Sequence, residues 1–84
     1  MNTPTDAAVL AGVEDVARRA LDWTGSLAPE TSLIDALELD SLRMLTLVVE
    51  LEDHFQICLE EGDEAGLTTV ADLVGLLRSR LDAR

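Results

Sequence analysis

The sequence has few residues with reactive or aromatic side chains. Among 84 residues there is no tyrosine or lysine, and cysteine, tryptophan, phenylalanine and histidine occur once each. A single cysteine, Cys58, excludes a disulfide within the chain and gives no sign of an oxidising compartment. With only 2% aromatic residues, leucine and valine must supply most of the buried surface. This favours helices packed through aliphatic stripes over an aromatic-rich sheet.

Segments that direct a chain to a membrane are also missing. Residues 1–20 have no basic start, and Asp6 and Glu14 interrupt their apolar residues, which argues against a secretory signal peptide. No run of apolar residues is long enough to span a bilayer. We therefore expect a cytoplasmic protein with no membrane partner.

Positive charge is scarce. Six arginines stand against 17 acidic residues, which gives a formal net charge of −11. Such a surface repels nucleic acid and anionic membranes, because both are bound through lysine and arginine. It attracts proteins that carry basic docking patches, and this attraction weakens with salt.

The residues that are present predict one small helical domain over 1–84, because a chain of this length forms a single modest core. Apolar residues recur at helical spacing in three segments, 3–23, 40–55 and 68–83. A long connection over 24–40 has a predicted helical turn at 33–36, and Gly62 and Gly66 allow one short helix between them. The fold class is therefore all-α, a small four-helix bundle with a short third helix and a long first loop.

The helix over 40–55 is the most strongly predicted. Asp40 supplies the capping side chain, and the wide apolar arc predicts that this helix is the most buried one. Its two apolar rows are Leu42/Leu45/Val49 and Met44/Val48/Leu51/Phe55. Its predicted outward positions are Arg43, Thr46, Glu50, Asp53 and His54. In the last helix, Thr69 and Asp72 form a predicted capping pair.

Catalytic and metal sites lack the necessary residues. One histidine, His54, and one cysteine, Cys58, provide neither a catalytic triad nor a zinc ligand set. The acidic residues Glu60, Glu61, Asp63 and Glu64 lack the alternating ligand pattern of a calcium loop. We therefore expect neither an enzyme nor a metal protein.

Ser41 remains as the position of interest, and two interpretations are open. It is either an ordinary serine at a helix start or a modification site. A helix start suits a phosphate ester, because its free N–H groups and positive dipole end stabilise the attached anion.

The segment "DSL", residues 40–42, is followed by "LVVELEDHF", by I-x-L-E and by "LTTVADLV". In this order the segments resemble the acyl carrier protein family over residues 33–77. In that family the serine of D-S-L carries a 4′-phosphopantetheine arm, which holds an acyl group as a thioester. The resemblance implies that Ser41 is this serine, and that Asp40 and Leu42 help a phosphopantetheinyl transferase to recognise it.

The resemblance also implies partners and surfaces. The expected partners are acyl- or aminoacyl-loading ligases, ketosynthases and other carrier-dependent enzymes, which meet a monomeric carrier. The expected docking residues are Glu38, Arg43, Glu50 and Asp53, together with the acidic residues at 60–64. A cleft between helices is expected to shelter the acyl chain, lined by Leu45, Val48, Leu51, Leu59 and Leu67.

Three residues depart from the family pattern. Glu38 replaces a common glycine, Arg43 replaces a common acidic residue, and Glu60 replaces a common proline. These differences favour polyketide or other specialised biosynthesis over housekeeping fatty acid synthesis. Two alternatives remain open: an aminoacyl or peptidyl carrier of a nonribosomal-peptide-type pathway, and an acidic helical interaction module whose Ser41 is never modified.

Overall fold

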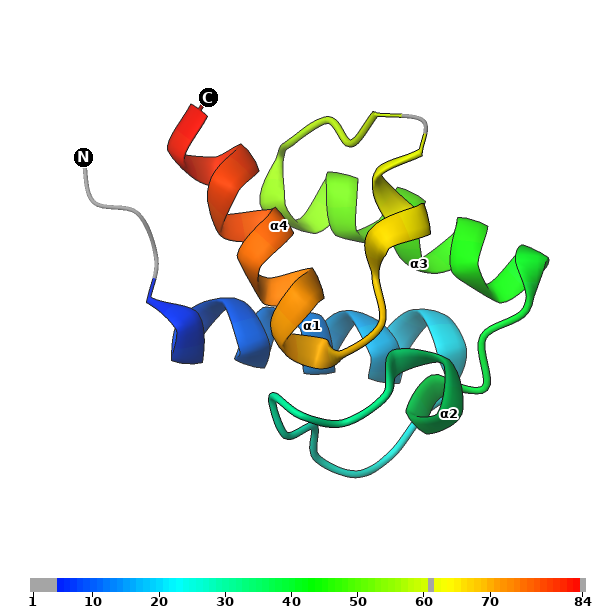
Figure 1. Cartoon of the computed structure of the whole chain (residues 1–84). Coiled ribbons are helices and arrows are strands. Elements are labelled where there is room, and N and C mark those ends of the chain that lie inside the picture. The colour runs from blue at the N-terminus through cyan, green and yellow to red at the C-terminus, as the bar shows by residue number, and fades with distance from the viewer. Residues whose placement is uncertain (1–4, 61, 84) are drawn as a thin grey trace.

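The computed structural model describes residues 5–60 and 62–83. It contains α1 (Asp6–Leu21), α2 (Leu33–Leu37), α3 (Ser41–Phe55) and α4 (Val70–Ala83), with a 3-10 turn, η1, at Asp63–Gly66 (Figure 1). Within these ranges there is no β-strand, only an isolated antiparallel bridge between Ser32 and Thr69. The predicted all-α fold, with three long helices and short elements in the two connections, is confirmed. Glu61 of the predicted acidic group lies outside the described residues.

Every α-helix begins at a side chain that accepts a backbone hydrogen bond. The capping residues are Thr5, Ser32, Asp40 and Thr69. The Asp40 carboxylate lies 2.8 Å from the backbone N of Arg43. Thr69 and Asp72 bond reciprocally, each side chain accepting from the other residue's backbone N–H at 3.2 and 3.0 Å. Each cap contributes about 1 kcal/mol to stability, and the predicted caps at Asp40 and Thr69 are confirmed.

The first three helices end without glycine. Asp22, Glu38 and Gln56 adopt left-handed backbone angles, with φ between 50° and 56°. Each donates its backbone N–H to a carbonyl of the last turn and so closes the helix. Because this conformation disfavours residues with a Cβ, Glu38 stands where a glycine would be free of strain. This position is the one at which the family pattern has its common glycine.

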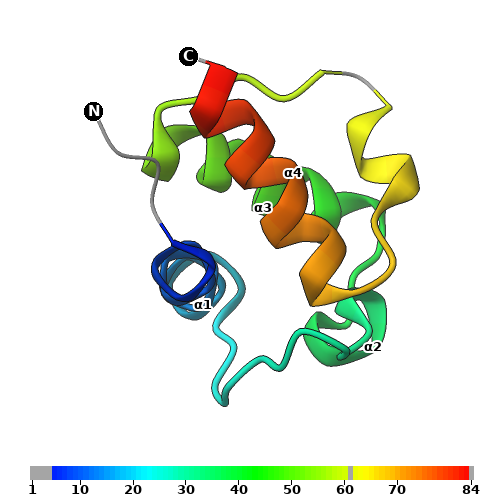
Figure 2. The ribbon, with the colours of Figure 1, turned by 60° about the vertical axis from the view of Figure 1, so that its left-hand side comes forward.

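The core lies where α1 packs against α3 and α4. Figure 2 looks nearly along α1 and shows the other two long helices beside it. The predicted stripe of α4 is confirmed as buried: Val70, Leu73, Val74, Leu77 and Leu81. α1 contributes Val9, Val13, Val16, Ala17 and Leu21. No helix within the described ranges combines the length and apolarity that crossing a bilayer requires.

The prediction that α3 is the most buried helix is wrong, and of its two predicted rows only Met44/Val48/Leu51/Phe55 is buried or half-buried. Only Leu47 and Leu51 of this helix are buried, and Leu47 belonged to neither predicted row. Leu42, Leu45 and Val49 are instead 71%, 60% and 50% exposed. Because apolar residues surround most of α3, its sequence allowed several orientations in the bundle. The contact with α1 selects the face that carries Leu47 and Leu51.

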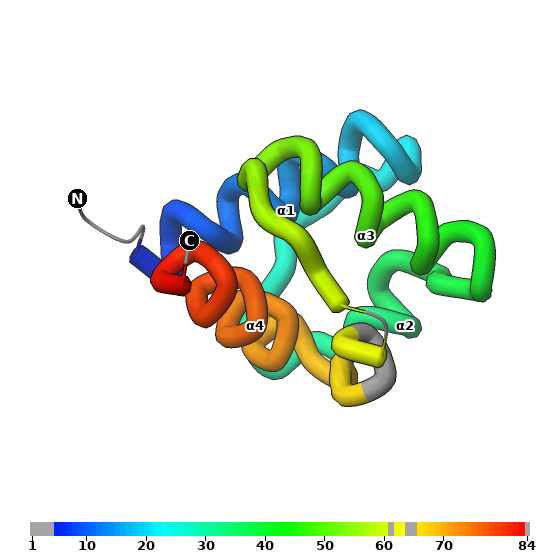
Figure 3. Tube along the Cα trace, turned by 90° about the horizontal axis from the view of Figure 1, so that it is seen from above, coloured from blue at the N-terminus to red at the C-terminus, as the bar shows by residue number. Residues whose placement is uncertain are grey.

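Two glutamates hold the connections to the bundle. Glu14 Oε2 accepts from the backbone N of Leu27 at 2.7 Å, which fixes the long first loop over α1. Glu52 Oε2 accepts from the backbone N of Leu59 at 2.8 Å. Figure 3 shows the segment after α3 running between α3 and α4 toward η1. Both connections are therefore held against the helices.

Gly75 offers a test of helix propensity. It lies inside α4, and a Cβ built there has no atom within 4 Å. Gly75→Ala should therefore raise the free energy of unfolding by about 1 kcal/mol, which raises the melting temperature by roughly 4–8 °C. Thermal unfolding followed by circular dichroism measures the shift.

Gly12→Ala is the matched comparison, because Gly12 lies inside α1. A Cβ at this position would lie 2.6 Å from Cζ of Phe55, so the ring must move and the gain in helix propensity is offset. Equal stabilisation by the two substitutions would contradict the close approach of Phe55 to α1.

Candidate functional site

Ser41 is the first residue of α3, and the start of this helix lies on the side of the molecule opposite the start of α1 and the end of α4 (Figure 1). Its side chain is exposed, and no hydrogen bond to its hydroxyl is formed among residues 5–60 and 62–83. The backbone N–H groups of Ser41 and Leu42 have no partner within the helix, because they belong to its first turn. An anionic ester on Ser41 would thus find free donors and the positive end of the helix dipole.

The two neighbours of Ser41 in the D-S-L segment differ in their contacts. Asp40 is exposed, and its carboxylate is engaged as the cap of α3. Leu42 is 71% exposed and lies beside the serine. An enzyme that approaches Ser41 therefore meets an exposed apolar side chain.

Arg43 does not point outward as predicted. Its Nε and Nη2 donate to the carbonyl oxygen of Leu37 at 3.2 and 2.9 Å, and Nη2 also reaches that of Leu21 at 3.4 Å. These carbonyls end α2 and α1, where the helix dipoles favour a cation. The guanidinium therefore ties the first turn of α3 to two other helices. Sequence reasoning missed this contact because Leu21 precedes Arg43 by 22 positions.

The residues predicted for an acyl cleft lie in different environments. Leu51 and Leu67 are buried in the core, Val48 and Leu59 are half-buried, and Leu45 faces solvent. None of these five residues lines the groove between α3 and α4, the groove between α1 and α4, or the groove beside Trp23.

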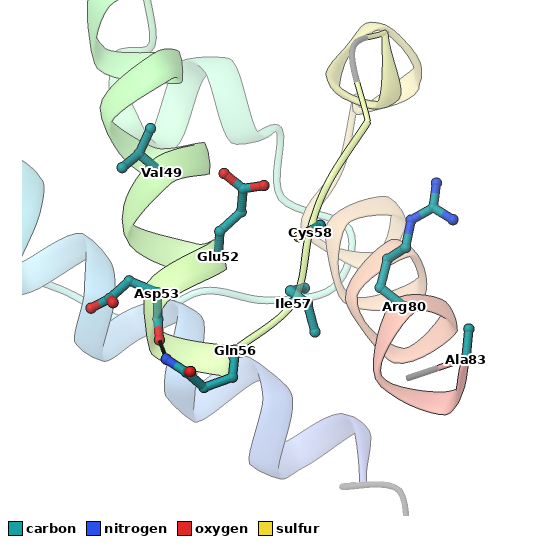
Figure 4. A pocket seen from close by; sticks show the side chains of 8 residues that line it. All are labelled: Val49, Glu52, Asp53, Gln56, Ile57, Cys58, Arg80 and Ala83. Atoms are coloured by element: carbon teal, nitrogen blue, oxygen red, sulfur yellow. Dashed lines mark hydrogen bonds between the residues drawn. The ribbon is translucent and has the colours of Figure 1, made fainter.

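The groove between α3 and α4 has a volume of about 780 Å³. Figure 4 shows its residues, which come from the second half of α3, the segment after it and the end of α4. They are Val49, Glu52, Asp53, Gln56, Ile57, Cys58, Arg80 and Ala83. One of the lining residues, Gln56, donates from Nε2 to the Asp53 carbonyl at 2.6 Å. Sequence reasoning missed this groove, because it joins segments far apart in the chain.

The predicted acidic docking residues differ in their exposure and in whether they form an ion pair. Glu38 and Asp53 are exposed and Glu50 is half-buried. Asp63, in contrast, forms an ion pair with Arg80, with 2.8 Å between Oδ2 and Nη2. The hydrogen bond from Arg80, and a second one from the backbone N of Glu60, hold the pKa of Asp63 below its usual value. This pair joins η1 to α4.

Asp63→Asn should lower the free energy of unfolding at pH 7, because the charged carboxylate binds Arg80 only in the folded chain. The folded pKa of Asp63 is depressed, so its stabilising contribution is full above the ordinary aspartate pKa of 3.8 and is lost as the pH falls through the lower folded value. Urea unfolding of native and variant chains at several pH values between 7 and 2.5 should show their difference shrinking below about pH 3.8.

Asp35→Asn is the control for the change in net charge. Asp35 is exposed and forms no ion pair with another described residue. A pH-independent difference for Asp63→Asn, or the same pH profile in both variants, would contradict the role of the ion pair.

No group of three or more histidine, cysteine, aspartate or glutamate residues within the described ranges could hold a metal ion.

Comparisons with known proteins agree on one kind of site. Residues 9–77 match the family described as "Phosphopantetheine attachment site". A meromycolate extension acyl carrier protein from Mycobacterium bovis is 32% identical over 75 residues, which cover 88% of this chain and 65% of the relative's length. Acyl carrier proteins from Exiguobacterium and Myxococcus xanthus are each 35% identical, over 81% and 82% of this chain and 86% and 89% of their own lengths.

Proposed function

The chain belongs to the acyl carrier protein family, whose prosthetic group is a covalently attached 4′-phosphopantetheine, and from this we propose that Ser41 is the attachment residue. The observation that carries the proposal is the exposed Ser41 hydroxyl at the start of α3, within the matched range 9–77. The free N–H groups of the first turn fit the phosphate of the arm.

Attachment requires a phosphopantetheinyl transferase, coenzyme A and Mg²⁺. Ser41 Oγ forms a bond to the phosphorus that bears the pantetheine, and the bond from that phosphorus to the adenosine bisphosphate breaks. The hydroxyl proton passes to a base of the transferase. The chain itself contributes position, because Asp40 caps α3 and Arg43 ties its first turn to α1 and α2.

When attached, the arm supplies the terminal thiol on which an acyl group is carried as a thioester. The protein acts as a carrier and not as an enzyme. Tethering raises the concentration of the acyl group at whichever enzyme is docked. Cys58 takes no part in carrying the acyl group, because the arm brings its own thiol.

Docking uses the acidic surface around α3. Glu38, Glu50 and Asp53, with the exposed Leu42, face a basic patch on the transferase, a loading ligase or a ketosynthase. Arg43 is left out of this surface, because its guanidinium is bonded to two helix ends. We place the carrier in the cytoplasm as a monomer.

The cargo we propose is an acyl group in polyketide or other specialised biosynthesis. Glu38, Arg43 and Glu60 distinguish the chain from the pattern of housekeeping carriers. The mycobacterial relative is named as a meromycolate extension acyl carrier protein, which supports acyl over aminoacyl cargo. An aminoacyl or peptidyl carrier remains the second candidate, since its arm and attachment chemistry are the same.

The test is the mass of the purified chain after incubation with coenzyme A, Mg²⁺ and a promiscuous transferase. A gain of one phosphopantetheine arm, located at residue 41 by fragmentation, is expected. An unchanged mass would overturn the proposal and favour an acidic interaction module. Loading of the modified chain by acyl-activating but not by amino-acid-activating ligases would separate the two candidate cargoes.

A further inference from the structure

One face of α3 connects Ser41 to the groove between α3 and α4. Ser41, Leu45, Val49, Glu52 and Gln56 follow one another at steps of three or four residues, so they lie on the same side of the helix. Leu45 and Val49 are 60% and 50% exposed, and Val49 also lines the groove. An apolar path thus leads from the serine to the groove.

The length of the arm matches this path. At 1.5 Å per residue, Asp53 lies about 18 Å from Ser41 along the axis of α3. An extended phosphopantetheine, with two amide units of peptide-like dimensions, also spans about 18 Å. Its thiol therefore reaches the groove when the arm follows the exposed face of α3.

The interior of the groove suits an aliphatic chain. Val49, Ile57 and Ala83 provide its apolar surface, and its volume of about 780 Å³ is ample for an acyl group. Two of its charged side chains already have partners within the chain. Glu52 accepts from the backbone N of Leu59, and Arg80 pairs with Asp63.

The other grooves are less well placed. The groove between α1 and α4 is lined by no residue of α3. The groove beside Trp23 contains Arg43, which lies two residues after Ser41 and hence on nearly the opposite side of α3. In the core, Leu51 and Leu67 are already buried against other side chains.

We propose that an aliphatic acyl chain on the Ser41 arm rests along Leu45 and Val49 in the groove between α3 and α4. This inference depends on the proposed attachment at Ser41, and it places the cargo outside the helical core. A partner enzyme that docks on the exposed face of α3 then displaces the chain and receives it.

The first test compares amide hydrogen exchange in acetyl- and octanoyl-loaded chains. Octanoyl, but not acetyl, should slow exchange at Ile57, Cys58 and Leu59 by about fivefold or more, because only the longer chain fills the groove. Val49→Asp should abolish this slowing. Ile34→Asp is the matched control, because Ile34 is 51% exposed on α2 and does not line the groove, so it should leave the slowing intact.

Slowed exchange at Leu51 and Leu67 without change at 57–59 would overturn the inference and place the acyl chain in the core. Both aspartate variants replace exposed side chains, so circular dichroism should show folded proteins. A chain that takes no arm at all contradicts the proposed function, whereas a loaded chain without protection at 57–59 contradicts this inference alone.

The second test uses Cys58, which is exposed and lines the groove. With glutathione disulfide as oxidant, the arm thiol and Cys58 should form an internal disulfide, each losing one hydrogen as two glutathiones form. In Cys58→Ser/Glu50→Cys the cysteine lies on the opposite side of α3, about 14 Å along its axis from Ser41. The effective concentration of the arm thiol at Cys58 should exceed that at residue 50 by about tenfold, and equal values would contradict the path.

Discussion

Ser41→Ala is expected to stay at its unmodified mass after treatment with coenzyme A and a phosphopantetheinyl transferase. Ser26→Ala and Ser79→Ala should take up one arm, as the native chain does. Both control serines are exposed, so accessibility alone does not distinguish them from Ser41. Ser41 differs in standing at the start of a long helix, beside the exposed Leu42 and next to the Asp40 cap.

The loss in Ser41→Ala should be one of chemistry and not of folding. The Ser41 hydroxyl has no hydrogen-bond partner among the described residues, and Asp40 continues to cap α3. The free energy of unfolding should therefore change by less than about 0.5 kcal/mol. An arm found on Ser41→Ala, or full modification lost in Ser79→Ala, would contradict the assignment.

Leu47→Ala should lower the free energy of unfolding by about 2–5 kcal/mol, because it opens a cavity in the core. The Leu47 side chain is 1% exposed and belongs to the hydrophobic core. A small domain has roughly 5–15 kcal/mol of total stability, so this substitution would remove a large share of it. Urea unfolding at 25 °C measures the difference.

Leu45→Ala is the matched control, because it removes the same atoms from the same helix. Leu45 is 60% exposed, so its loss should change stability by no more than about 0.5 kcal/mol. Similar losses in the two variants would mean that α3 is turned differently about its axis. The pair thus tests the orientation of α3, which the wide apolar arc in the sequence left open.

The parts of the fold that sequence analysis predicted are local. The caps at Asp40 and Thr69 depend on contacts within three residues, which the sequence displays directly. The stripe of α4 is narrow, so only one orientation buries it. The apolar arc of α3 is wide, and its orientation depends on how α1 packs, which no short segment encodes. The ends of α1, α2 and α3 lacked glycine and so gave no clear signal.

In the candidate site, too, the local features could be predicted and the contacts between distant segments could not. Ser41 could be identified because its segment and those downstream resemble a family in order. The groove at Val49 and Ile57 could not, because it exists only when the end of α4 meets the segment after α3. The carbonyl partners of Arg43 were equally hidden, since the ends of α1 and α2 come together with it only in the folded chain.

The position of Arg43 also sets a limit for engineering. In the sequence it stands in the middle of the segment that a designer would transplant to change the partners of this carrier. In space it belongs to the frame that holds α1, α2 and α3 together. A graft that copies 40–50 from another carrier as one block would remove that tie. A graft that changes only the exposed positions and keeps Arg43 would alter recognition on an intact frame.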